Sequence, residues 1–221
     1  SVFNKVHKKY DFMNDLMSFG IHRLWKRNMI NWLHPQKNTK LLDVASGTGD
    51  LAKIFSEKTN NDNKIFCVEP NKYMLEVGRE KLKKYKNIKW VQASAEKLPY
   101  KDNTFDYYTI SYGIRNVNNI NLCLREAYRV LKVGGRFMCL EFSKVENEIL
   151  EGLYNQYSKL IPPIGKYVVG SSAPYVYLVK SIEHFYSQNE LKKLIETNGF
   201  INVEYRNLSS GISAIHSGWK I

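Results

Sequence analysis

A glycine turn follows the first apolar run of the chain, in the stretch LLDVASGTGDLA at residues 41–52. Glycine lets the backbone approach a ligand closely, and the exposed amides of a helix that starts there can bind polar groups. Glu69 ends the next apolar run, 20 residues after Gly49. A carboxylate at that place can accept hydrogen bonds from both hydroxyls of a ribose. These residue types and spacings therefore predict a site for a cofactor that contains a ribose.

A dinucleotide is one cofactor that fits the turn. Gly47-x-Gly49-x-x-Ala52 satisfies the GxGxx(G/A) pattern of NAD-dependent enzymes. Tyr128 and Lys132 also have the four-residue spacing of a proton-transfer pair that some dehydrogenases use. Both lie at the end of an expected helix, away from the carboxyl end of any strand. We therefore interpret these two as ordinary helix residues, while the dinucleotide alternative stays open.

S-adenosylmethionine (SAM) is the second cofactor that fits. Asp43 lies ahead of Gly47 and Gly49 with the D-x-(G/A)-x-G-x-G spacing that is typical of the first motif of class I methyltransferases. SAM has no phosphates, so the turn needs fewer amides aimed at one point and can contain Thr48. Residues 94–106 fit the loop that flanks the adenine. A turn that joins a strand to a helix and binds nothing is the structural alternative.

The elements that must position these residues alternate between strands and helices. Apolar residues at helical spacing are most regular over 120–131, where we expect a helix that ends at Gly134-Gly135. Residues 200–220 are expected to form a hairpin that turns at 209–211. Serial βα units predict an α/β fold with a doubly wound sheet, helices on both faces and a C-terminal antiparallel hairpin. The expected strands before the hairpin are 40–45, 64–69, 88–93, 105–111 and 136–142.

The length of the chain favours one domain over residues 1–221, because 221 residues are enough for a single full core. The net charge of +12 indicates either attraction to an anionic partner or a solvated basic helix face, since many lysines cluster at residues 79–89. The cysteines, Cys67, Cys123 and Cys139, are scattered, as in proteins of a reducing compartment. The sequence contains no CxxC, HxxxH or HExxH motif, so we expect no metal site.

Six segments, in the same order, resemble the UbiE-type C-methyltransferases of ubiquinone and menaquinone biosynthesis. They are KYDFMNDLMSFGIHRLWKR, LLDVASGTGDL, AEKLPYKDNTFD, ISYGIRNV, YRVLKVGGRFMCLEFS and SGISAIHSGWK. The resemblance extends from about residue 2 to the last residue. The departures are Ala45-Ser46 where many members have Ala-Gly, and Glu69 where some have Asp. Neither departure removes a functional group that the site needs.

The resemblance implies a Rossmann-like, seven-stranded class I methyltransferase with SAM as its cofactor. It implies methyl transfer to a ring carbon of a polyprenylated hydroquinone. The cofactor contacts of the family correspond in this chain to Thr48, Glu69, Ser94, Ala95 and Ser111. With Asp43, Gly47 and Gly49 of the glycine turn, these residues form the expected cofactor site.

Arg115 stands a few residues beyond the strand expected at 105–111, and the resemblance marks it as a catalytic residue. A hydroquinone ring carbon is a weak nucleophile until a neighbouring hydroxyl, with a pKa of ~10, loses its proton. A guanidinium with a pKa above ~12 is a poor base. We therefore expect Arg115 to stabilise the phenolate while a water takes the proton. The alternative is a structural ion pair with a helix or loop carboxylate. The resemblance also points to Tyr10 as a hydrogen-bond partner of a quinol oxygen.

Two regions interrupt the alternation of strands and helices. Residues 1–34 are expected to form a helical segment on the substrate side, and residues 147–185 an inserted lid that binds the polyprenyl tail. The lid is rich in Tyr, Val, Leu and Ile; a helical pair that packs on the sheet or serves a homodimer is the alternative. No apolar run approaches the ~20 residues of a membrane span. The chain begins at Ser1 inside a patterned segment, so we expect that a leader peptide was removed or left out.

The surroundings of the protein are also implied by resemblance. SGISAIHSGWKI at the end of the chain and LHP at 33–35 are closer to the mitochondrial ubiquinone branch than to bacterial members. This predicts a methoxy-benzoquinol acceptor and a place in the mitochondrial matrix, peripheral to the inner membrane. Demethylmenaquinol and a membrane-associated location in the bacterial cytoplasm are the alternatives. Basic residues with Trp25 and Trp32 are expected to touch an anionic membrane surface, and an assembly of ubiquinone-pathway proteins is expected.

Rival functions share parts of these patterns. A methyltransferase that acts on RNA would have the same fold and positive charge. Here, however, the strand at 105–111 leads into Ser-Tyr-Gly-Ile and not into the Asn/Asp-Pro-Pro-aromatic box that holds an exocyclic amine. We therefore expect no nucleic-acid partner. A non-catalytic SAM-binding scaffold and an NAD-dependent dehydrogenase are the other rivals.

Overall fold

The computed structural model describes residues 20–145 and 173–221, together with Gly152 and Pro163. The strands are β1 (Lys40–Val44), β2 (Lys64–Val68), β3 (Ile88–Val91), β4 (Phe105–Ser111), β5 (Leu131–Phe142), β6 (Ile201–Leu208) and β7 (Ser213–Trp219). The α-helices are α2 (His22–Leu33), α3 (Asp50–Lys58), α4 (Lys72–Lys81), α5 (Ile120–Val130), α7 (Ala173–Glu183) and α8 (Gln188–Thr197). Two short 3₁₀ helices are η2 (Ile114–Asn116) and η3 (Ser209–Gly211).

One sheet of seven strands organises the molecule, in the order β3-β2-β1-β4-β5-β7-β6. β1 to β5 pair in parallel, whereas β7 pairs antiparallel with both β5 and β6. The strand order reverses direction between β1 and β4, which is the switch point at which open α/β sheets bind ligands. The expected seven-stranded sheet with a C-terminal hairpin is confirmed, and the second strand of the hairpin inserts between the first strand and β5.

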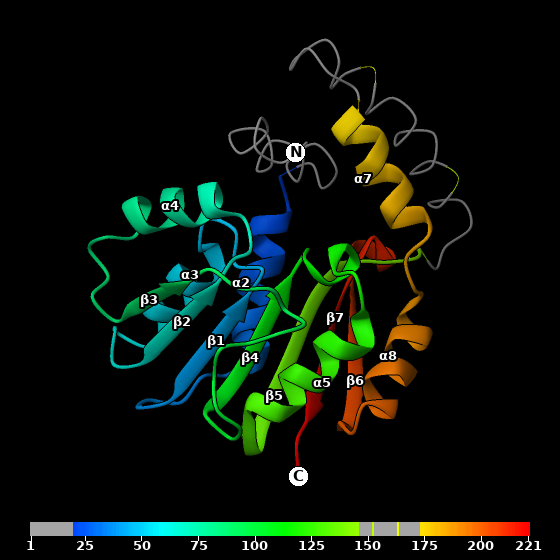
Figure 1. Ribbon diagram of the computed structural model, residues 1–221. Helices are drawn as coiled ribbons and strands as arrows, with labels where there is room; N and C mark the ends of the chain where they lie inside the picture. The colour runs from blue at the N-terminus through cyan, green and yellow to red at the C-terminus, as the bar shows by residue number, and fades with distance from the viewer. Residues whose placement is uncertain (1–19, 146–151, 153–162, 164–172) are drawn as a thin grey trace.

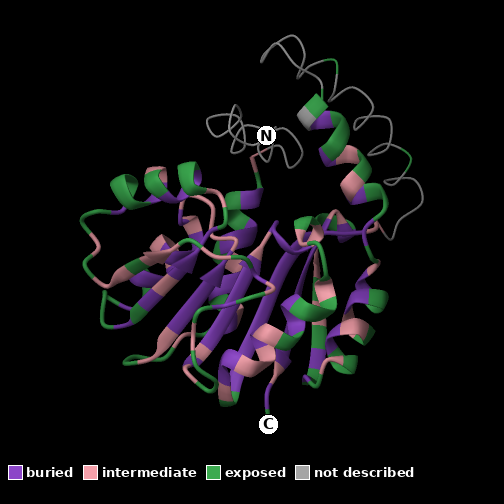
Figure 2. Ribbon diagram, viewed as in Figure 1, coloured by how far each residue is buried: buried purple, intermediate pink, exposed green. Residues whose placement is uncertain are grey.

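The core lies on both faces of the sheet because successive side chains of a strand point to opposite sides. Leu41 of β1 joins α2 and α3 in one apolar cluster, and Leu42 joins α5 and α8 in the other. Tyr107 and Tyr108 of β4 divide in the same way. In Figure 1, α5 and α8 lie in front of the sheet and α2 lies behind it. Figure 2 shows the central strands as an almost continuous buried layer between these helices.

The junction between α5 and β5 differs from the expectation that Gly134-Gly135 ends the helix. α5 ends at Val130, and Leu131 is already extended and pairs with Phe105 of β4. Gly134, with φ +78°, lies within a β-bulge of the strand, and its N–H donates to the carbonyl of Lys220 at 2.7 Å. Pairing with two neighbouring segments therefore ends the helix earlier than the glycines alone would.

The two regions that interrupt the alternation are described in part. Within 1–34, α2 is a helix as expected, and its residues Trp25 and Met29 are buried. Within 147–185, the structure describes α7, which packs on η2 and donates a hydrogen bond from the Tyr177 hydroxyl to Asn116 Oδ1 at 3.1 Å. Among the described residues, no helix has the length and apolarity that crossing a membrane would require.

Candidate active site

A cavity of about 770 Å³ opens at the carboxyl ends of the parallel strands, around the switch point between β1 and β4. This volume lies within the range of small-molecule sites, roughly 300–1,000 Å³. Loops that follow four neighbouring strands supply most of its wall. The lining consists of 45–48, 69–74, 94–96, 111–113 and 116–118, together with Lys26, Asp50 and Glu76.

The glycine loop, residues 45–49, forms the wall after β1. Gly47 and Gly49 adopt φ values of +56° and +85°, which side chains other than that of glycine rarely tolerate. A Cβ on Gly49 would lie 2.6 Å from Leu82 Cδ1 and 2.9 Å from Trp90 Cη2, so this position also has no space for a methyl group. The loop leads directly into the first turn of α3, whose first residue, Asp50, also lines the cavity. The predicted glycine turn is therefore present, and its residues 45–48 line the cavity.

Glu69, after β2, closes the same wall through its carboxylate. Oε2 accepts the N–H of Gly47 at 2.8 Å, and Oε1 accepts the N–H of Asn71 at 2.9 Å. Burial raises the pKa of Glu69, although both backbone hydrogen bonds oppose the shift. Each oxygen keeps a further lone pair for a ribose hydroxyl. The residue therefore stands where the sequence predicted and is fixed by the loop that it supports.

Asp43 lies below the glycine loop and is not among the residues that line the cavity. Its side chain is fully buried, and Oδ1 accepts a hydrogen bond from Thr109 Oγ1 at 2.7 Å. Burial raises the pKa of Asp43 to about 7, while the Thr109 hydrogen bond and the charge of Lys26 oppose this. The structure therefore places Asp43, which was predicted as a cofactor-binding residue, behind the cavity lining, where its carboxylate joins β1 to Thr109 of β4.

Lys26 is a cavity residue that the sequence did not reveal. It comes from α2, and its Nζ donates to Asp50 Oδ2 at 2.9 Å with both groups facing the start of α3. Lys81 Nζ donates to Asp50 Oδ1 at 2.7 Å and to Thr48 Oγ1 at 3.1 Å. Burial opposes ionisation of Asp50, but the two lysines outweigh it and lower its pKa. A basic residue in an N-terminal helix carries no local motif, so only the packing of α2 on α3 brings it here.

Ser94, Ala95 and Ser111 line the cavity, as the sequence predicted for cofactor-binding residues. Ser94 and Ala95 lie near the start of the irregular segment that joins β3 to β4, called the β3–β4 loop (residues 92–104). Ser111 is the last residue of β4, beside Tyr112 and Gly113 of the same wall. The structure therefore brings Thr48, Glu69, Ser94, Ala95 and Ser111 around one cavity.

Arg115 lies in η2, between the cavity-lining residues Gly113 and Asn116, but is not itself part of the lining. Its Nη1 donates to Glu141 Oε1 at 2.5 Å, and both side chains are 2% exposed. Its guanidinium lies 5.5 Å from the ring centroid of Phe142. Burial raises the pKa of Glu141, against the lowering effect of Arg115. The carboxylate partner that the sequence left open is therefore present, and it comes from strand β5.

Tyr10, which the resemblance predicts to hydrogen-bond a quinol oxygen, lies outside the described residues.

The two tryptophans that were expected at a membrane surface lie in or against the core. Trp25 is buried, with its ring 6.5 Å from that of Phe142, and Trp32 packs on the guanidinium of Arg136. Trp25 is therefore core-facing and not available to a membrane surface, whereas Trp32 is half-buried and packs against the edge of the core. Tyr128 and Lys132 lie outside the cavity. In the described part of the chain, no group of three or more His, Cys, Asp or Glu side chains is placed to hold a metal ion.

Known proteins show the same combination of fold and sequence. The profile of the ubiE/COQ5 methyltransferase family matches residues 1–220. The ubiquinone/menaquinone biosynthesis C-methyltransferase UbiE of Brucella abortus is 50% identical over 226 residues, covering 100% of this chain and 84% of that protein. The enzyme of the same name from Brucella anthropi is 51% identical and is covered to 86%.

Solved structures match at the level of the fold. A SAM-dependent methyltransferase of Thermotoga maritima has a TM-score of 0.70 at 23% identity, with 100% of this chain and 99% of that chain covered. A SAM-dependent methyltransferase of Aquifex aeolicus has a TM-score of 0.67 at 18% identity, with 95% and 97% covered. At these identities the likeness concerns the class I methyltransferase fold alone.

Proposed function

This chain belongs to the ubiE/COQ5 methyltransferase family, the SAM-dependent C-methyltransferases of ubiquinone and menaquinone biosynthesis, and we propose that its acceptor is a methoxylated polyprenyl benzoquinol. The observation that supports SAM-dependent transfer is the cavity at the switch point, in which four strand ends supply the residues that the resemblance assigns to SAM. The choice of a methoxylated benzoquinol rests on the resemblance of residues 33–35 and 210–221 to the ubiquinone branch. The wider name of the relatives, ubiquinone/menaquinone, makes a demethylmenaquinol the second candidate acceptor.

Each end of the cavity suits one part of SAM. Lys26 and the first turn of α3 offer positive charge to the carboxylate of the methionine part, beside Thr48. Glu69 is placed to accept the ribose hydroxyls, and Ser94 and Ala95 to flank the adenine. Ser111 would then stand next to the sulfonium. When bound, SAM supplies an electrophilic methyl group, and its sulfur leaves with the electrons of the C–S bond.

The acceptor ring must become nucleophilic at carbon. Loss of the hydroxyl proton gives a phenolate, whose electrons reach the ring carbon that forms the new C–C bond; the ring proton at that carbon leaves afterwards. On the family resemblance we propose that Arg115 stabilises the phenolate from behind the wall formed by Gly113 and Asn116, because a fixed charge in a dry site costs no reorganisation during the reaction. Glu141 holds the guanidinium at 2.5 Å and sets its direction. Tyr10 is proposed to hydrogen-bond a quinol oxygen, and a water to carry the proton.

The location of the protein is proposed on weaker resemblances. Residues 33–35 and 210–221 support the mitochondrial matrix face of the inner membrane, whereas the relatives above are bacterial. A peripheral membrane contact is supported by the outer face of α2, where the exposed Leu24 lies near Arg23 and Arg27. Flotation with anionic liposomes tests it: the Leu24→Glu variant should float less than the unmodified protein. A homodimer, an assembly with other pathway enzymes and the lid role of residues 147–185 rest on the sequence alone.

The decisive experiment offers labelled SAM and two reduced, short-tailed acceptors side by side, a methoxy-benzoquinol and a demethyl-naphthoquinol. We expect transfer to the benzoquinol, at least tenfold faster in kcat/KM, about 1.4 kcal/mol of discrimination. Faster transfer to the naphthoquinol would overturn the choice of ring. Transfer to neither, with SAM bound, would overturn the proposal that this chain alone methylates a quinol.

Arg115 is tested with the buried pair kept balanced, because Arg115→Ala would leave Glu141 as a buried unpaired charge at a cost of about 3–5 kcal/mol. The double variant Arg115→Met/Glu141→Gln removes both charges. We expect kcat to fall about 100-fold with an unchanged SAM affinity. Full turnover in that folded double variant would make Arg115 a structural residue.

A further inference from the structure

The β3–β4 loop lines the cavity at its beginning but has no helix or strand of its own. Connections longer than about 12 residues without such elements are uncommon in compact domains, and most are either functional or disordered. The middle of this loop is held by the neighbouring helix α5, whose side chains Glu126 and Arg129 bind it at Leu98, Tyr100 and Asp102.

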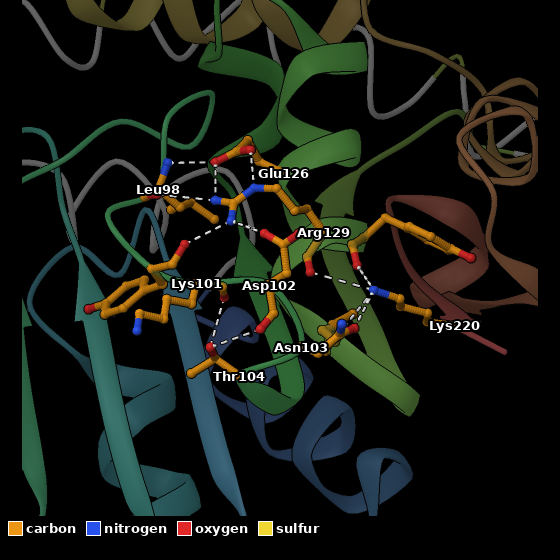
Figure 3. Close-up of polar contacts among 11 residues, drawn as sticks. Leu98, Lys101, Asp102, Asn103, Thr104, Glu126, Arg129 and Lys220 are labelled. Atoms are coloured by element: carbon orange, nitrogen blue, oxygen red, sulfur yellow. Dashed lines mark hydrogen bonds and ion pairs between the residues drawn. The ribbon is translucent and has the colours of Figure 1, made fainter.

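Arg129 makes most of these contacts. Nη1 donates to the Tyr100 carbonyl at 2.8 Å and to Asp102 Oδ1 at 2.7 Å, and Nη2 donates to the Leu98 carbonyl at 3.2 Å. Nε and Nη2 donate to the two carboxylate oxygens of Glu126, at 2.6 and 2.8 Å. A guanidinium has five N–H groups, and these five bonds use all of them. Figure 3 shows the guanidinium between the loop and the carboxylate.

Glu126 holds the other backbone group of Leu98. Its Oε2 accepts the N–H of Leu98 at 2.7 Å, so one residue of the loop has both its amide and its carbonyl fixed by α5. The hydrogen bond from Arg129 lowers the pKa of Glu126, which keeps the carboxylate ionised. The Leu98 side chain is itself buried in the core. We call Glu126 and Arg129 the loop clamp.

The loop clamp is connected to the cavity wall through Glu96. Glu96 lies two residues before Leu98 and lines the cavity, and its Oε1 accepts the N–H of Asn118 at 2.7 Å. Asn118 belongs to the segment after η2, which also lines the cavity. Movement of Leu98 would therefore displace both Ser94–Glu96 and the segment to which Glu96 is bonded.

We propose that Glu126 and Arg129 are positioning residues for the cofactor, which hold the β3–β4 loop in the conformation that receives the adenine of SAM. The inference rests on the proposed placement of the adenine beside Ser94 and Ala95. A loop that is ordered before the ligand arrives binds more tightly, because its conformational entropy is already lost. The loop clamp therefore acts on cofactor affinity and not on the chemical step.

The test uses Arg129→Lys, which keeps the positive charge but has three donors in place of five and no planar fork. We expect KM for SAM and Kd for S-adenosylhomocysteine to rise about tenfold, with kcat and the quinol KM within about twofold of the unmodified enzyme. Lys132→Gln is the matched control. Lys132 lies just beyond α5 and pairs with Asp106 at 2.6 Å, and neither residue lines the cavity. In this control, KM for SAM, Kd for S-adenosylhomocysteine, kcat and the quinol KM should all be unchanged.

Free adenosine separates the two ends of the cofactor. Its inhibition constant should rise by the same factor in Arg129→Lys, because adenosine contains the adenine and lacks the methionine part. An unchanged constant for adenosine, with weaker S-adenosylhomocysteine binding, would overturn the proposal that the loop clamp serves the adenine. Binding of S-adenosylhomocysteine needs no acceptor. If the proposed quinol is wrong, the unmodified enzyme fails to methylate it, but the Kd for S-adenosylhomocysteine can still be measured and compared between variants.

Two further outcomes would also overturn the proposal. The first is an unchanged Kd for S-adenosylhomocysteine in folded Arg129→Lys. The second is a lower kcat with an unchanged KM for SAM. If Arg129→Lys does not fold, Glu126→Gln replaces it, since the amide retains one acceptor oxygen and gives up the second. We expect that variant to weaken S-adenosylhomocysteine about threefold, and no change in it would contradict the proposal.

Discussion

Two of the loops that line the cavity at the switch point are shaped in different ways. The glycine loop (residues 45–49) follows β1 and owes its path to its own backbone, with positive φ at Gly47 and Gly49 and an internal hydrogen bond from Gly49 N to Ser46 O at 2.9 Å. The β3–β4 loop (residues 92–104) owes its path to side chains of α5, which bind it at Leu98, Tyr100 and Asp102. One loop is specified locally, and the other is specified by a helix that follows it in the chain.

This difference predicts how each loop responds to amino-acid substitutions. A locally specified loop has little tolerance for substitution at its glycines, because both the backbone angle and the surrounding space are fixed. A loop held by several side-chain bonds loses its order gradually, as single bonds are removed. Changes in the first loop should therefore be severe and changes in the second graded.

The largest effect is expected for Gly49→Ala. The new Cβ would meet Leu82 and Trp90 at 2.6 and 2.9 Å, at φ +85°. Overpacking and backbone strain together should lower the free energy of unfolding by about 4 kcal/mol and abolish SAM binding. Gly134→Ala is the matched control, since φ is +78° there and nothing lies within 4 Å of the added Cβ. It should cost about 1 kcal/mol, as measured by urea unfolding. Equal losses in the two variants would show that space around Gly49 does not matter.

Two cavity carboxylates give the next comparison, one for each loop. Glu69 is bonded to the glycine loop through Gly47 N, and Glu96 belongs to the β3–β4 loop and is bonded to Asn118 N. Glu69→Gln removes an acceptor that serves the loop and that we propose to bind a ribose hydroxyl, so we expect the Kd for S-adenosylhomocysteine to rise about 30-fold, or about 2 kcal/mol. Glu96→Gln should change it by less than about threefold. Calorimetric titration measures both, and the reverse order would remove Glu69 from the cofactor site.

Asp43, which lies in β1 just before the glycine loop, makes the free energy of unfolding depend on pH. Its pKa is raised from 3.8 to about 7 by burial, so the folded state takes up a proton that the unfolded state has lost. The free energy of unfolding should therefore fall as pH rises from about 4 to 7, by at most about 1.4 kcal/mol per pH unit, and level off above that range. Asp43→Asn keeps an acceptor for Thr109 and should flatten this slope in urea unfolding at several pH values. A slope unchanged by the substitution would assign it to other groups.

Lys220 holds the far end of the β3–β4 loop and should show the smallest effect. Its Nζ donates to Asn103 Oδ1 and to the carbonyls of Tyr128 and Leu131, each at 2.8 Å (Figure 3). Lys220→Met should lower the free energy of unfolding by about 1 kcal/mol without a change in SAM affinity, because this end of the loop is away from the cavity. Thermal unfolding and S-adenosylhomocysteine titration check the two parts, and a weaker affinity would extend the positioning role to the whole loop.

Local patterns predicted the elements that depend on local rules. The alternation of apolar residues gave the strands, with β4 at residues 105–111 as expected and β3 ending two residues earlier than expected. The glycine turn was recognisable because positive φ and close approach require glycine itself. Thr48, Glu69, Ser94, Ala95 and Ser111 were assigned through the family resemblance, and their places after the ends of parallel strands, which meet at one edge of the sheet, agree with that assignment.

Local sequence patterns did not predict features that depend on contacts with a distant segment of the chain. Gly134-Gly135 suggested the end of a helix, but pairing of Leu131 with Phe105 ends α5 at Val130. Lys26 has no local signal, since its place in the cavity depends on α2 packing against α3. The structural alternative for Arg115 placed a carboxylate partner on a helix or loop, yet strand β5 supplies Glu141.

The sequence by itself therefore determined the order of the elements, the glycine loop and the edge of the sheet at which the cavity opens, because periodicity and backbone conformation are properties of neighbouring residues. Only the tertiary structure decided which charges meet: Lys26 with Asp50, Arg115 with Glu141, and Arg129 with the β3–β4 loop. These partners are 24 or more residues apart in the chain. Their pairing depends on which face each helix packs against and which strand lies next to which, and no local pattern contains that information.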